Sequence, residues 1–210
     1  MTAVFPGAES SVRRPSGRTS ATFRVLAHEE EELLAYASVF CGGFDAESLA
    51  AVMGDLERAR VDAIAERLVA GSVLGRSGGG GVRVAAATAE LASAKLAQSG
   101  RQADAIARHA DRFAELARAL CRDDAGPDAA RARRRLAVEA ENFAVILRRG
   151  ATHHDEIEPA LVLESALALA ASAQGGTSLA RALSGLDAAL QRSGNAIDTA
   201  LQTRALLARG

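Results

Sequence analysis

The stretch from Leu33 to Leu49, LLAYASVFCGGFDAESL, decides how the chain begins to fold. Leu33, Tyr36 and Phe40 recur at helical spacing, so the first helix has an apolar face that must be buried. The glycine pair at 42–43 is expected to end this helix. The stretch therefore predicts a helix, a glycine break and the start of a second helix, and it carries no catalytic chemistry.

The second helix is predicted from Ala46 to about Met53, with a defined start. Asp45 is placed to accept a backbone hydrogen bond as its N-cap, and Phe44 and Leu49 are spaced as a hydrophobic staple. A third helix is predicted from about Leu56 to Ala70, because apolar residues again recur at helical spacing. The residues on its apolar face are Val61, Ile64, Ala65, Leu68 and Val69.

The composition is typical of a helical protein of one large or two small domains. The chain has 210 residues, of which 49% are hydrophobic but 3% aromatic, and its formal net charge is −1. This balance predicts no whole-chain attraction to nucleic acid or anionic lipid. Neither Cys41 nor Cys121 stands in a metal-binding motif, and the sequence shows neither a signal peptide nor a membrane span. We expect reduced thiols in a cytoplasmic protein.

A β-hairpin is predicted after the third helix, since Val73 and Leu74 and then the alternating residues 82–84 flank a glycine run. The run at 78–81 lacks the Lys-Ser or Lys-Thr pair of a phosphate-binding loop, so we interpret it as the hairpin tip. The first 27 residues are rich in Ser, Gly, Pro and Arg and predict a basic, disordered tail.

From about Thr88 onward the pattern is helical, with breaks expected near Gly100, at 125–127, near Gly150, at 175–176 and at 193–194. These intervals are typical of paired antiparallel helices with a loose repeat of about forty residues. The predicted inner faces are 106/110/113/120, 136/140/143/147 and 179/183/186/190. The predicted fold class is mainly α, with a winged-helix domain at 28–99 and a degenerate, truncated tetratricopeptide-like array at 101–210.

Five segments, in order, resemble one protein family. Residues 38–45, SVFCGGFD, closely resemble a signature in the winged-helix region of bacterial signal-transduction ATPases with numerous domains, which are large transcriptional regulators. Related multidomain kinases carry similar blocks. The other segments that resemble this family are 68–74, 96–100, 108–113 and 139–143. The resemblance implies a winged helix followed by tetratricopeptide-like repeats from about Leu26 to the end.

The chain also departs from that family. Upstream of Leu26 there is no GxxxxGK[ST] motif, so the resemblance gives no support to a nucleotide site. Some relatives place a His-Asp pair after the second wing strand, but Ala85 and Ala86 occupy the matching positions here. We therefore expect no nucleotide and no cofactor. One alternative is that the chain is a non-functional fragment of a longer regulator.

The sequence offers little support for an enzyme or a metal site. His153, His154, Asp155, Glu156 and Glu158 form a cluster at the start of a predicted helix, where acids cap and adjacent ligands point in different directions. His109 lies beside an apolar stripe and is interpreted as a packed helix contact. No nucleophile is paired with a base, so we predict no enzymatic activity.

Two functions remain, and they differ in the partner. We favour a non-enzymatic regulatory module that binds a protein partner through the helical array. The alternative is a DNA-binding winged-helix transcription factor, for which the candidate residues are Arg58, Arg60, Arg67 and Arg83. Nucleic-acid binding is weakly supported, because the charges of the third helix are balanced by Glu57, Asp62 and Glu66. A weaker basic patch is formed by Arg131, Arg133, Arg134 and Arg135.

Overall fold

A computed structural model describes residues 26–54, 56–123, 128–152, 157–173, 176–194 and 197–209. These residues form a mainly helical structure with one two-stranded sheet, which confirms the expected mainly-α class. The helices are α2 (His28–Ala37), α3 (Ala46–Met53), α4 (Arg58–Ala70), α5 (Ala86–Gln98), α6 (Gln102–Asp123), α7 (Ala129–Val138), α8 (Ala140–Thr152), α9 (Pro159–Ser172), α10 (Gly176–Ser193) and α11 (Thr199–Arg209).

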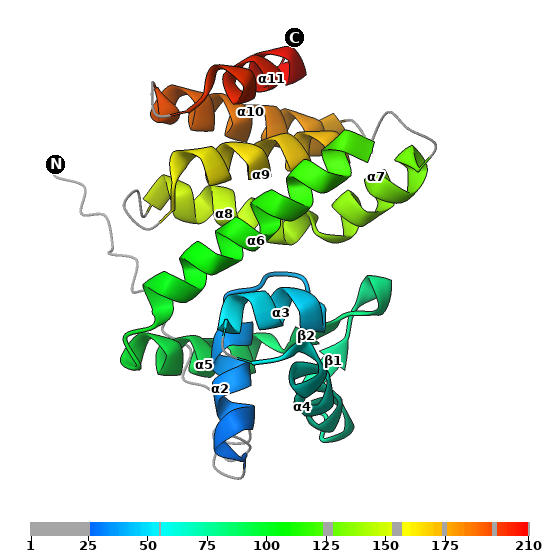
Figure 1. The fold of residues 1–210 in the computed structure, drawn as a ribbon, viewed down its shortest axis with the longest axis vertical. Helices are drawn as coiled ribbons and strands as arrows, with labels where there is room; N and C mark the ends of the chain where they lie inside the picture. Colours follow the sequence, from blue (N-terminus) through cyan, green and yellow to red (C-terminus); the bar gives the residue numbers. More distant parts are fainter. Residues whose placement is uncertain are drawn as a thin grey trace, which may run out of the picture.

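The long helix α6 crosses the molecule diagonally between two groups of helices (Figure 1). One group contains α2, α3, α4, the hairpin and α5. The other group contains α7 to α11, and its helix α9 packs against α6, α8 and α10. Because α3 also packs against α6, that helix contacts both groups.

The start of the chain follows the expected order of helices, with one difference. Helix α3 has the predicted bounds, and the Asp45 side chain accepts a hydrogen bond from the Ser48 backbone N–H (2.8 Å), as an N-cap should. Helix α2, however, ends at Ala37, before Phe40. The Ser38 hydroxyl donates to the Ala35 carbonyl (2.6 Å) in the last turn, and a serine that bonds the backbone in this way competes with helix continuation.

The predicted hairpin is present and is tied to the glycine break. Strand β1 (Leu74–Arg76) pairs antiparallel with β2 (Val82–Val84), and the short 3-10 helix η1 (Gly78–Gly80) forms the tip. Phe44 pairs with Val82 through two backbone hydrogen bonds of 2.8 and 2.9 Å. The stretch before α3 therefore acts as a third, one-residue strand beside the hairpin.

The helix breaks were predicted in part. Gly100 and Gly194 follow the ends of α5 and α10, with φ of +74° and +48°. The break expected near Gly150 is also present, because α8 ends two residues later at Thr152, but Gly150 itself lies inside the helix. A break that was not predicted separates α7 from α8 at Glu139. The predicted breaks at 125–127 and at Gly175 lie outside the described residues.

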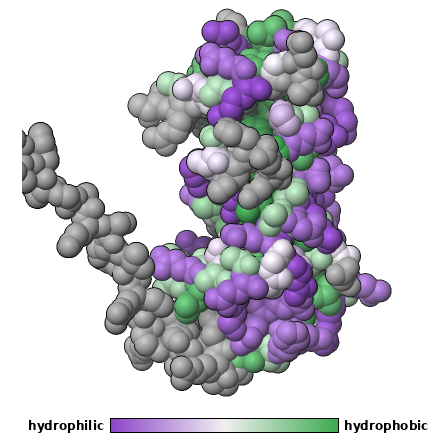
Figure 2. Space-filling model, turned by 90° about the vertical axis from the view of Figure 1, so that its left-hand side faces the viewer, coloured by the Kyte–Doolittle hydropathy of each residue, from purple (hydrophilic) through white to green (hydrophobic). Residues whose placement is uncertain are grey.

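The core is continuous from the first group of helices to the second. Its largest fully buried side chains include Leu33 from α2, Ile64 from α4, Phe113 from α6, Phe143 from α8 and Leu163 from α9. On the face shown in Figure 2, hydrophilic side chains dominate and hydrophobic ones form small groups between them. None of the described helices combines the length and apolar character that a membrane crossing requires.

Candidate interaction site at the junction of α3, α6 and α7

Arginines from α6 and α7 hold helix α3 at both of its ends. At its C-terminal end, Arg108 donates to the Met53 carbonyl (3.0 Å), which is one of the carbonyls that a helix end leaves without an internal partner. The other two contacts are charged: Arg112 with Glu47 (2.7 Å) and Arg135 with Asp45 (2.7 Å). Helix α3 is thus fixed at its C-terminal end by α6 and at its N-terminal end by both α6 and α7.

Asn142 of α8 binds the glycine break directly. Its Oδ1 accepts a hydrogen bond from the Cys41 backbone N–H (2.8 Å), and its Nδ2 donates to the Gly43 carbonyl (2.9 Å) and to Glu139 (2.9 Å). The residue is 1% exposed, so these bonds form away from water. Buried polar groups of this kind fix the relative position of the segments they join.

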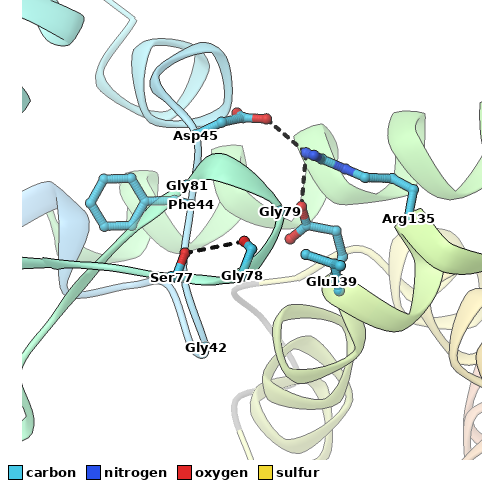
Figure 3. A pocket seen from close by; sticks show the side chains of 11 residues that line it. Gly42, Phe44, Asp45, Ser77, Gly78, Gly79, Gly81, Arg135 and Glu139 are labelled. Atoms are coloured by element: carbon cyan, nitrogen blue, oxygen red, sulfur yellow. Dashed lines mark hydrogen bonds and ion pairs between the residues drawn. The ribbon is translucent and has the colours of Figure 1, made fainter.

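Arg135 bridges two carboxylates beside the same break (Figure 3). It pairs with Asp45 and, one turn along its own helix, with Glu139 (2.8 Å). Burial acts to raise the pKa of Asp45, but hydrogen bonds from Ser48 and Arg135 outweigh it, so this pKa is lowered. Burial dominates at Glu139 and raises its pKa, although Asn142 and Arg135 both favour its charged form.

A small pocket lies between this bridge and the hairpin tip, where the glycine loop faces the two carboxylates (Figure 3). Its volume is about 130 Å³, which is below the usual size of a small-molecule site. The carboxylates of Asp45 and Glu139 in its lining would repel a phosphate. The interpretation of the glycine run as a hairpin tip, and not as a phosphate cradle, is consistent with this chemistry.

His109 of α6 lies in an aromatic cluster below the bridge. Its ring is edge-on to Phe40 (centroids 4.9 Å apart) and tilted on Phe113 (4.7 Å), which in turn contacts Phe143 (5.7 Å). The imidazole is fully buried, and neither nitrogen has a hydrogen-bond partner among the described residues. Burial, together with the charge of Arg149, lowers the pKa of His109 to about 3. The predicted role as a packed helix contact is confirmed.

A larger groove runs between α6 and α7 and is bounded by the hairpin tip at Gly79. Its volume is about 630 Å³. Each helix contributes one stripe of side chains at helical spacing: Arg112, Leu116 and Leu120 from α6, and Arg131, Arg134, Arg135 and Val138 from α7. The apolar side chains line the floor, and Val138 is 46% exposed there.

The arginines of this groove fall into two classes. Arg112 and Arg135 are partly buried and engaged with α3, as described above. Arg131 and Arg134 are exposed, and neither makes an ion pair with a residue that the structure describes. The sequence predicted the basic run 131–135 as a weak basic patch. In the structure, Arg135 is engaged with α3, whereas Arg131 and Arg134 carry charges that no described residue pairs with.

The candidate DNA-binding arginines, with one exception, are engaged in ion pairs with carboxylates. Arg58 pairs with Glu47 and Asp62, Arg60 with Glu29, and Arg67 with Glu30. Most of these carboxylates come from α2 and α3. The sequence predicted Glu57, Asp62 and Glu66 as the balancing acids, and of these Asp62 alone pairs with one of the three arginines. Arg83 on β2 is exposed and makes no ion pair with a described residue.

The acidic run at the start of α2 has a role that sequence reasoning missed. Each of its four carboxylates pairs with a different base: Glu29 with Arg60, Glu30 with Arg67, Glu31 with Lys95 and Glu32 with Arg101. Acidic residues in the first turn also suit the positive end of the helix dipole, but that effect alone does not account for the four ion pairs. The spacing of the run did contain a signal, because consecutive helix positions point to different neighbours, here α4 on one side and α5 on the other.

The other predicted site residues give no further site. His153 to Glu156 lie outside the described residues, and Glu158 precedes α9 as its N-cap position. Within the described ranges no three His, Cys, Asp or Glu side chains cluster as metal ligands. Both cysteines are half-buried thiols. Ala85 and Ala86 begin α5, where their side chains are exposed.

No protein-family model matches the chain, and neither the curated proteins nor the solved structures include a significant match.

Proposed function

We propose that the chain is a non-enzymatic protein-interaction module of a bacterial signalling regulator. In this proposal, residues 28–99 form a winged-helix-like domain and residues 101–210 a degenerate tetratricopeptide-like array. The order of three helices, a hairpin and a further helix supports the first assignment. The contacts between consecutive helices from α6 onward support the second. We place the module in the cytoplasm and assign it no nucleotide.

The observation that carries this proposal is the groove between α6 and α7. Its floor is apolar, its walls are two helical stripes, and its volume of about 630 Å³ is open to a side chain or a helix from outside. Grooves of this construction are a common mode of helix recognition. The ion pair of Arg112 with Glu47 holds the α6 wall, and the ion pair of Arg135 with Asp45 holds the α7 wall, so a partner would meet a surface that is already formed.

The charges on α4 support a protein partner over DNA. A recognition helix needs cationic side chains that can reach phosphates. Arg58, Arg60 and Arg67 are instead engaged with carboxylates of the same chain. Each exposed pair is weak by itself, so the argument rests on the net charge near the helix, which these carboxylates cancel.

The test is affinity capture with the purified chain as bait, with direct binding of each captured protein measured afterwards. We expect a specific protein that binds in the micromolar range or tighter, about −8 kcal/mol. The proposal fails if the chain retains no specific protein and binds duplex DNA tightly in a mobility-shift assay.

A DNA-binding winged helix remains the second candidate because Arg83 is exposed on the wing strand and unpaired among the described residues. In this case, replacing Arg83 by Ala should weaken DNA binding and reduce its salt dependence by about one phosphate contact. Replacing Arg58, Arg60 and Arg67 tests readout by α4, since unchanged affinity in that variant would exclude it.

A further inference from the structure

The groove between α6 and α7 has a charge pattern that identifies the chemistry of its partner. Arg131 and Arg134 stand on the outer wall, three residues apart, so their guanidinium groups lie on one side of α7. Val138 continues the same stripe and is apolar. Across the groove, Leu116 and Leu120 lie one helical turn apart on α6. The groove thus pairs an apolar floor with two unsatisfied positive charges along one edge.

We propose that this groove binds an acidic amphipathic helix of a partner protein. Leucine-type side chains of that helix would cover Leu116, Leu120 and Val138, and carboxylates one turn apart on its flank would pair with Arg131 and Arg134. The inference rests on the proposed protein-binding function and adds the chemistry of the ligand to it. A helix is favoured because both walls are helical stripes, into which the ridges of a third helix can pack.

The acidic residues around the groove make a nucleic acid an unfavourable ligand. Asp45 and Glu47 lie at one end, where they already bind Arg135 and Arg112, and Asp128 lies near the start of α7. A polyphosphate backbone would have to pass these carboxylates, whereas a helix can place single charges opposite the two arginines. An apolar floor also gives a phosphate backbone nothing to contact, while it stabilises an amphipathic helix by burial.

The basic N-terminal segment of the same chain has the wrong charge for this edge. Residues 1–24 contain Arg13, Arg14, Arg18 and Arg24 but a single acid, Glu9. Binding it beside Arg131 and Arg134 would bring like charges together without a counterion. The charge complementarity therefore points to a separate, acidic partner.

The test uses the full chain and synthetic peptide helices in a fluorescence anisotropy titration. The first peptide carries leucines at i, i+3 and i+7 and glutamates on the flank of that stripe. The second is identical with every Glu replaced by Gln, and the third keeps the composition of the first in scrambled order. We expect the first peptide to bind at least about 10-fold tighter than the other two, with an affinity that falls as salt is raised.

Charge reversal in the groove should remove this preference. Arg131→Glu with Arg134→Glu should weaken binding of the Glu peptide by about 10-fold or more and leave thermal unfolding unchanged, because both side chains are exposed. The matched control, Arg122→Glu with Arg192→Glu, makes the same charge change at exposed positions outside the groove and should bind like the wild type. Val138→Ser should weaken both the Glu and the Gln peptide, because it removes an apolar contact.

Several results would overturn the inference. Equal binding of the Glu and Gln peptides would do so. The inference would also fail if the Arg131→Glu/Arg134→Glu variant bound the peptide normally but lost duplex DNA binding or self-association. If a captured protein binds this variant and the wild type equally, the proposed function stands and the acidic-helix inference falls. If the wild type binds no protein or peptide, both fall.

Discussion

The side chain of Asn142 accepts a hydrogen bond from the backbone of Cys41, a residue 101 positions earlier in the chain. The same amide donates to the Gly43 carbonyl, so one side chain binds the backbone on both sides of Gly42. This contact joins α8 to the segment that precedes α3. It explains how a break rich in glycine keeps a fixed conformation, in which φ at Gly42 is +88°.

Replacing Asn142 by Ala should destabilise the protein by about 2–4 kcal/mol, because it leaves a backbone N–H and a carbonyl without their partner. Urea unfolding monitored by circular dichroism measures this change. The control is Glu141→Gln, which alters the exposed neighbouring side chain and should change stability by less than about 0.5 kcal/mol. A similar loss in both variants would contradict the role given to Asn142.

Replacing Arg135 by Met should cost about 1–3 kcal/mol at pH 7. The side chain is partly buried, so its ion pairs are worth more than exposed ones, and its removal leaves Glu139 charged in a site that is 5% exposed. The deficit relative to wild type should shrink in Arg135→Met/Glu139→Gln, because the unpaired charge is then gone. A double-mutant cycle by urea unfolding measures the coupling.

The pH dependence of this deficit gives a separate check. The pKa of Glu139 is raised in the folded protein, so the folded state binds that proton more tightly than the unfolded state. Acidification from pH 7 toward the ordinary pKa of 4.5 then favours folding through this group. The difference between Arg135→Met and wild type should therefore narrow at pH 5. A deficit that widens there would argue against a buried, uncompensated Glu139.

The sequence predicted those features whose signals are local. The bounds of α3 follow from Asp45 and the staple residues within one turn, and the hairpin follows from alternation around a glycine run. Gly100 ends α5 because it lies in the left-handed region, which glycine adopts without strain.

The junction could not be predicted in the same way, because its partners are distant in the sequence. Nothing near Arg135 indicates that it reaches Asp45, 90 residues earlier. The break at Glu139 could not be predicted either, because no glycine or proline marks the end of α7. The Glu139 side chain at this position is instead bound by Asn142 and Arg135. The packing role of Gly150 could not be predicted either, because the residue that leaves no space for a side chain there is Val162 of α9.

His109 should make the protein sensitive to mild acid. Its pKa is about 3 in the folded protein, whereas the ordinary pKa of a histidine is 6.5. Below about pH 6.5 the histidine of the unfolded chain therefore binds a proton, whereas that of the folded chain stays neutral. The contribution of His109 to the free energy of unfolding is present above that pH and is lost as the pH falls toward 3. The expected loss is about 1.4 kcal/mol per pH unit within this window.

The variant His109→Leu should lack this component, so its stability should fall less than that of wild type, by about 2–3 kcal/mol between pH 7 and 4.5. Asp45, whose pKa is lowered, acts mainly below its ordinary value of 3.8 and is common to both proteins. Urea unfolding across this range measures the difference. Nuclear magnetic resonance gives the control, since the His109 ring should stay neutral to about pH 5; titration of the ring near 6.5 would contradict its burial.

Gly150 should prove to be a packing residue and not a helix terminator. A Cβ added there would lie 2.5 Å from a methyl carbon of Val162 on α9, although the helix itself would accept alanine. We expect Gly150→Ala to cost about 1–3 kcal/mol through overpacking, and Val162→Ala to cost a similar amount through lost burial, since Val162 is 5% exposed. In the double variant the new methyl group occupies the space that the valine leaves, so the two losses should be less than additive by about 1 kcal/mol. Additive losses in urea unfolding would mean that the helices move apart to admit the methyl group, and that the close approach of α8 and α9 at this glycine is not required by the fold.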